Sequence, residues 1–114
     1  MNYGGHLGND RLLVFAQEAR AAWLGSLDCH ELSIFGTQII LADAAIRFQN
    51  EGFMGDELTV SLYMGEANRY GFDLYYRVSK GDTSIAEMKT AVLFRDNESH
   101  QLCAPPDAFL ARIR

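Results

Sequence analysis

The sequence predicts an α+β domain in which a curved antiparallel sheet wraps around one long central helix. Near the start of the chain, apolar residues recur every three or four positions, as they do on one face of a helix. Later they alternate at every second position, as in half-buried strands, and only short turns separate these segments. Short turns indicate antiparallel pairing, because parallel strands need long crossover connections. With 114 residues, we expect a single domain spanning 1–114.

The helix is predicted from Asn9 to Leu27. Asn9 is a candidate N-cap, since its side chain can accept a hydrogen bond from the first helical turn. At 1.5 Å per residue the helix would be about 27 Å long, so we expect the other elements to pack around it. Polar Arg11, Gln17, Glu18 and Arg20 fall between the apolar positions, which are Leu12, Leu13, Phe15, Ala16, Ala19, Ala22, Trp23, Leu24 and Leu27.

Four segments with a period of two follow the helix and are predicted to be strands. They span residues 38–49, 57–66, 69–80 and 83–96. Turn residues, Gly55-Asp56 and Lys80-Gly81-Asp82, precede the second and the fourth strand. Near the end of the chain, Pro105 and Pro106 precede an apolar stretch around Phe109, which predicts a short helix with a proline in its first turn.

Composition excludes several classes of protein. The longest apolar runs, such as Ile39 to Ala42, are far shorter than the roughly 18 to 20 residues of a membrane span. A net charge of −5 and a pI near 5.0 disfavour nucleic-acid binding. The first ten residues lack the basic and apolar regions of a signal peptide, so we expect a cytoplasmic protein. Cys29 and Cys103 lack metal-site spacing, which predicts free thiols and no metal centre.

Three local patterns point to a known family. Residues 2–10 read Asn-Tyr-Gly-Gly-His-Leu-Gly-Asn-Asp, and Glu18-Ala19-Arg20 follows His6 by twelve positions on the helix. Gly55-Asp56-Glu57-Leu58 precedes a strand, and the last strand contains Ala-Glu-Met-Lys-Thr at 86–90. In this order the patterns resemble the hotdog superfamily, specifically the 4-hydroxybenzoyl-CoA thioesterase-like branch of acyl-CoA thioesterases, whose loop reads Asp-x-x-Gly-His-Val-Asn-Asn.

The resemblance implies a fold, an activity and a quaternary structure. It implies a hotdog fold that hydrolyses an acyl-CoA, or another acyl or aroyl thioester, to the free acid and the CoA thiol. Coenzyme A would enter as part of the substrate, with no separate cofactor, and the protein would be a homodimer or homotetramer. The family has a strand before the loop, whereas this chain begins at the loop, so we expect that strand to be lacking. A sheet edge left unpaired in this way favours association with another chain.

The loop at the start of the chain is expected to bind the substrate. Its glycines let the backbone turn tightly and bring N–H groups near a thioester carbonyl, and the start of the helix adds further unpaired N–H groups. Such donors stabilise the oxyanion that forms during hydrolysis. The glycines are also compatible with a simple turn before a helix. We assign substrate binding to Tyr3, Gly4, Gly5, Leu7, Gly8 and Asn9.

The catalytic acid of the family is not found at its usual place. The family's loop aspartate corresponds to Asn2, whose amide can hold a water but cannot take its proton. A second family branch places a carboxylate where this chain has the apolar residues 12–14. The remaining candidates are His6, Asp10 and Glu18. Each also has a structural alternative: His6 bonding the turn, Asp10 stabilising the helix start, or Glu18 pairing with Arg20 or a partner subunit.

The acyl group is expected between helix and sheet or at a subunit interface, lined by residues such as Leu13, Phe15 and Ala42. Coenzyme A phosphates need cations, and several cations lie on or beside the predicted strands. Exposed strand faces carry such charges in any case, so no single one is assigned. The candidates are Arg47, Arg69, Arg77, Lys80, Lys89 and Arg95.

Two other functions are compatible with a hotdog domain. The asparagine at position 2 suggests a non-catalytic protein that binds acyl-CoA or lipid without turnover. A hydratase would keep an aspartate and a histidine with Asn-Pro between them. The stretch from Asn2 to His6 has the wrong spacing and no proline, which disfavours a hydratase.

Overall fold

A computed structural model describes residues 9–50 and 57–113 and confirms the predicted α+β fold. The elements are α1 (Asn9–Ser26), β1 (Thr37–Phe48), β2 (Thr59–Met64), β3 (Gly71–Lys80), β4 (Thr83–Asp96), β5 (Leu102–Cys103) and α2 (Asp107–Ile113). The long helix, the four main strands and the short terminal helix all form where the sequence predicts them. The two-residue strand β5 was not predicted.

Helix α1 ends one residue before the predicted Leu27 because the chain changes direction there. Asp28 adopts a left-handed conformation with φ of 58°, a common way to terminate a helix. The Cys29 N–H then donates to the Leu24 carbonyl at 2.8 Å and satisfies one of the last helical acceptors. No helix in the described part of the chain is long and apolar enough to cross a membrane.

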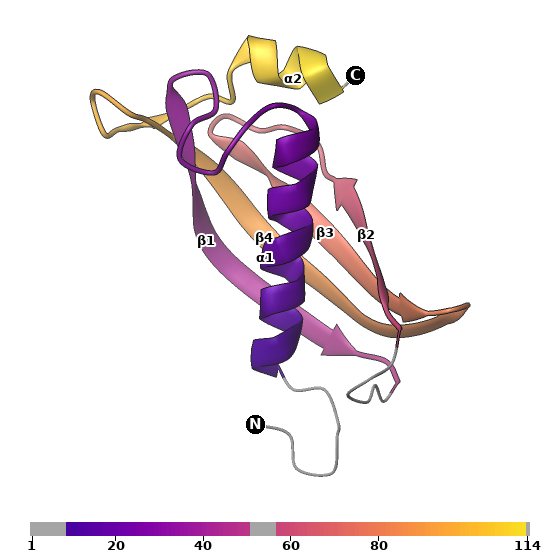
Figure 1. The fold of residues 1–114 in the computed structure, drawn as a ribbon. Coiled ribbons are helices and arrows are strands. Elements are labelled where there is room, and N and C mark those ends of the chain that lie inside the picture. Colours follow the sequence, from indigo (N-terminus) through magenta and orange to yellow (C-terminus); the bar gives the residue numbers. More distant parts are fainter. Residues whose placement is uncertain (1–8, 51–56, 114) are drawn as a thin grey trace.

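The strands form one antiparallel sheet in the order β1-β4-β3-β2, with β5 paired to the end of β4. Figure 1 shows α1 lying across one face of this curved sheet, with α2 beyond the C-terminal end of α1. The register of β1 on β4 shifts between Leu41 and Asp43, and such a bulge bends a strand and increases its twist. The predicted wrapping of a sheet around a central helix is therefore confirmed.

Strands β2 and β3 are shorter than predicted, and an asparagine in the connection between them sets the start of β3. The Asn68 Oδ1 accepts hydrogen bonds from the N–H groups of Tyr70 and Gly71, each at 3.1 Å. Such local bonds compete with strand pairing, so β3 begins at Gly71 and not at residue 69. A side chain at Gly71 would collide with the backbone carbonyl of Val92, so the strand approaches its neighbour closely at this glycine.

The hydrophobic core lies between α1 and the inner faces of β3 and β4. Alternation along β3 directs every second side chain toward the helix, and α1 contributes residues at helical spacing. The buried apolar residues are Leu12, Ala16 and Leu24 of α1, Phe72, Leu74, Tyr76 and Val78 of β3, Ile85, Ala86, Met88, Val92 and Phe94 of β4, and also Ile34 and Phe109. This packing fixes α1 against the middle of the sheet.

An aromatic cluster closes the core at the end of α1. The ring of Phe109 in α2 lies 5.7 Å from that of Phe94 and 5.9 Å from that of Trp23. Phe72 packs at 5.8 Å from Phe94 and meets Trp23 edge-on at 6.3 Å. Aromatic pairs at such distances stabilise a core beyond the area that they bury. The short helix α2 is therefore attached to the domain through Phe109, which is fully buried.

Candidate functional site

Most of the predicted site lies outside the described residues. This holds for Asn2, Tyr3, Gly4, Gly5, His6, Leu7 and Gly8. Asn9 and Asp10 begin helix α1, but their side chains are also outside the described part. Glu18 is the predicted catalytic residue whose side chain is described, so the site is built from its surroundings.

A cavity of about 510 Å³ opens beside Glu18 between α1 and the edge strand β2. Phe15, Glu18 and Ala19 line it from the helix, because residues three and four apart share one helical face. Val60 of β2 and Leu58, which directly precedes this strand, line it from the other side. Four apolar side chains thus line the cavity together with one carboxylate, a composition typical of small-molecule sites.

The Glu18 carboxylate is exposed and stands free within this cavity. No hydrogen bond or ion pair connects it to another described side chain. The alternative pairing with Arg20 is not formed, because residues two apart point to different sides of a helix. Arg20 instead binds Glu31. An unpartnered carboxylate against an apolar wall is a group that can take a proton from a water.

Arg20 points into the core and fixes the orientation of α1. Its Nε donates to Glu31 Oε1 at 2.6 Å and its Nη1 donates to Tyr76 Oη at 3.0 Å. The Tyr76 hydroxyl is also hydrogen-bonded to Thr90 Oγ1 at 2.8 Å. Burial disfavours the charged guanidinium, but the bonds to Tyr76 and Glu31 outweigh this cost and raise the Arg20 pKa above its ordinary value. Because Arg20 is anchored inward, Glu18 is held on the other side of the helix.

The residues expected to line an acyl site are only partly brought together. Phe15 lines the cavity as expected, whereas Leu13 and Ala42 are exposed and do not line it. The Arg11 guanidinium lies 5.3 Å from the centre of the Phe15 ring, close enough for a cation–π contact. Arg11 is not among the cations predicted for coenzyme A, but its spacing of four residues from Phe15 puts both residues on one face of the helix.

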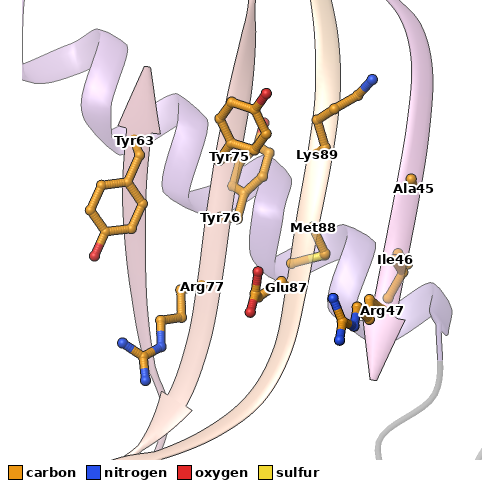
Figure 2. A pocket seen from close by; sticks show the side chains of 10 residues that line it. All are labelled: Ala45, Ile46, Arg47, Tyr63, Tyr75, Tyr76, Arg77, Glu87, Met88 and Lys89. Atoms are coloured by element: carbon orange, nitrogen blue, oxygen red, sulfur yellow. The ribbon is translucent and has the colours of Figure 1, made fainter. Parts of the chain in front are cut away.

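Three of the predicted cations meet on the opposite side of the sheet. Arg47, Arg77 and Lys89 line a second cavity of about 510 Å³. Figure 2 shows their side chains in front of the strands, with α1 passing behind. These cations are therefore separated by the sheet from the cavity that contains Glu18.

Comparison with known proteins identifies the family. Residues 1–113 match the profile of the thioesterase-like superfamily. The chain belongs to this superfamily. No curated protein is significantly similar to it in sequence.

Several solved structures share the architecture of this chain. A hypothetical protein from Aquifex aeolicus superposes with a TM-score of 0.86 at 22% identity, covering 99% of this chain and 90% of that one. A 1,4-dihydroxy-2-naphthoyl-CoA thioesterase from Synechocystis gives 0.85 at 21% identity, with coverages of 99% and 86%. A hypothetical protein from Staphylococcus aureus in complex with CoA gives 0.83 at 17% identity, with coverages of 99% and 73%. The predicted hotdog fold is confirmed.

Proposed function

We propose that this protein hydrolyses an acyl thioester of coenzyme A to the free acid and the CoA thiol. The observation that carries the proposal is the free carboxylate of Glu18 in a mainly apolar cavity of a thioesterase-like chain. Two structural neighbours are described as a 1,4-dihydroxy-2-naphthoyl-CoA thioesterase and a gentisyl-coenzyme A thioesterase, and a third holds CoA. These neighbours support an acyl-CoA as the substrate class.

In the proposed reaction, the acyl group lies against the apolar wall and a water is held near Glu18. The carboxylate takes a proton from this water as the oxygen attacks the thioester carbonyl. Backbone N–H groups of the loop before α1 and of its first turn stabilise the oxyanion. When the C–S bond breaks, the CoA thiolate leaves and accepts the proton. Asn2, His6 and Asp10 remain candidates for holding or activating the water, with Asn2 limited to hydrogen bonding.

The edge strand β1 supports the proposal of a homo-oligomer. Among the described strands, β1 lies at one end of the sheet and pairs only with β4. Its residues 41–45 are exposed. An exposed edge strand of this length is a template for pairing with a second chain. We infer a homodimer or homotetramer acting in the cytoplasm.

Release of free thiol from a panel of short-chain, long-chain and aromatic acyl-CoAs tests the proposed activity. Hydrolysis well above the background rate for at least one substrate is expected. The alternative, a protein that binds acyl-CoA without turnover, is motivated by the asparagine at position 2. It predicts tight binding of acyl-CoA by calorimetry with no thiol release, and that result would replace the hydrolase proposal.

A further inference from the structure

The sheet face turned away from α1 carries a second cavity, separate from the one that contains Glu18. Tyr76 points toward the helix, where it binds Arg20. Since side chains alternate along a strand, its neighbours Tyr75 and Arg77 point to the opposite face. There they help to line the cavity of about 510 Å³ seen in Figure 2. This volume lies within the usual range for small-molecule sites, roughly 300 to 1,000 Å³.

One row of this face offers aromatic rings. Tyr63 of β2 and Tyr75 of β3 are direct partners across the sheet, and they are 56% and 43% exposed. Neither ring makes a ring contact or hydrogen bond with another described side chain. Lys89 of β4 is the next partner of Tyr75. Two adjacent exposed tyrosines provide a surface on which a planar ring can stack.

The next row offers two arginines. Arg77 of β3 and Arg47 of β1 are both partners of Glu87 in β4, one on each side. Neither guanidinium forms an ion pair or hydrogen bond with a described residue. The Glu87 carboxylate instead accepts a hydrogen bond from Gln49 Nε2 at 2.8 Å. The whole chain has a net charge of −5. The two unpaired arginines therefore concentrate positive charge locally, on this face.

We propose that this face binds a nucleoside phosphate. The base stacks on Tyr63 and Tyr75, an interaction that tolerates any base. The phosphate lies between Arg77 and Arg47, whose planar forks match phosphate oxygens. Neighbouring rows on one face are about 6.7 Å apart and strands two apart are separated by about 9.6 Å. These spacings allow one ligand to reach both rows.

Calorimetry with AMP and with adenosine tests the site without any acyl substrate, so its outcome is independent of hydrolysis. We expect AMP to bind and adenosine to bind at least about tenfold more weakly, because it lacks the charged group. Arg77→Gln and Tyr75→Ala should each weaken AMP binding by about tenfold or more. The matched control is Arg69→Gln. Arg69 stacks over Tyr70 outside this cavity, so the control should bind AMP as the wild type does.

Two results would overturn the proposal. One is the absence of AMP binding at millimolar concentration, and the other is unchanged binding in both variants. If the variants dissociate an oligomer in sedimentation while AMP fails to bind, the face belongs to a second copy of the chain. Competition with CoA identifies the natural ligand of the site. If CoA displaces AMP, the ligand is the nucleotide part of coenzyme A. If CoA leaves AMP binding unaffected, the ligand is a free nucleotide.

Discussion

Arg20 Nη1 lies 3.0 Å from Tyr76 Oη and joins helix α1 to strand β3 across 56 residues of sequence. Arg20 is only 4% exposed, so a charged group is held inside the core by the bonds to Tyr76 and Glu31. A buried charge is tolerated only where such partners satisfy it. The bond therefore sets the rotation of α1, and with it the side of the helix that carries Glu18.

Removing the Tyr76 hydroxyl should destabilise the protein. Tyr76→Phe leaves the buried Arg20 guanidinium short of one acceptor, which costs about 2 to 3 kcal/mol. Urea unfolding measures the difference. The control Tyr75→Phe removes a hydroxyl from an exposed neighbour and should change the free energy of unfolding by less than about 0.5 kcal/mol. Equal losses in the two variants would contradict the assigned role of this bond.

The aromatic cluster should account for the attachment of α2. Phe109→Ala removes a fully buried ring that packs on Phe94 and Trp23. Deletions of this kind cost about 3 to 5 kcal/mol. Leu32→Ala, at a residue 62% exposed, should cost less than about 0.5 kcal/mol. A thermal melt of Phe109→Ala that coincides with the wild type would show that α2 is not needed for the core.

Acid should reveal the contribution of Asp96 to stability. The backbone N–H groups of Ser99 and Glu98 donate to its Oδ1 and lower the pKa of this carboxyl below its ordinary value. Stability from a lowered pKa is complete above the unfolded value, about 3.9, and is lost as the pH falls through the folded value. Asp96→Asn should therefore be less stable than the wild type at pH 6, and the difference should shrink from about pH 4 downward.

The control for this experiment is Asp82→Asn, which changes the net charge equally at an exposed turn. The experiment compares the denaturant midpoints of all three proteins from about pH 2 to pH 7. This range covers the reference pKa of aspartate, about 3.9. A stability difference between wild type and Asp96→Asn that does not vary with pH would contradict the role of the charged carboxylate.

The edge of β1 should hold a second subunit. Leu41 is 43% exposed on this strand, and a lysine there opposes edge pairing. Leu41→Lys should raise the dimer dissociation constant at least about tenfold, measured by sedimentation equilibrium. Leu32→Lys, in the loop before β1, should leave it unchanged. A wild-type chain that sediments as a monomer at high concentration would rule out this interface.

Much of the fold was predictable because its periodic patterns are long. The helical spacing from Leu12 to Leu24 continues over several helical turns. The alternation along β4 continues over several pairs of residues. The short strand β5 carries too few residues to show any period, and the start of β3 depends on a side-chain bond from Asn68. Both depend on local hydrogen bonding that periodicity does not reveal.

The candidate site was less predictable because it depends on tertiary packing. Periodicity placed Arg20 among the polar positions, yet Glu31 and Tyr76, distant in sequence, provide the bonds that bury it. Likewise, Leu58 and Val60 line one cavity with Glu18 only because α1 packs beside β2. The loop residues of the predicted site rest on family resemblance, and their roles stay predictions.

The most direct test of the proposed hydrolase compares the wild type with Glu18→Gln on the acyl-CoA that the wild type cleaves fastest. If Glu18 activates the water, kcat should fall at least about 100-fold, with little change in KM, because the amide keeps the shape of the cavity. Glu98→Gln, an equal charge change at an exposed turn, should leave kcat unchanged. A Glu18→Gln enzyme with the kcat of the wild type would contradict the assignment of the catalytic site to the cavity between α1 and β2.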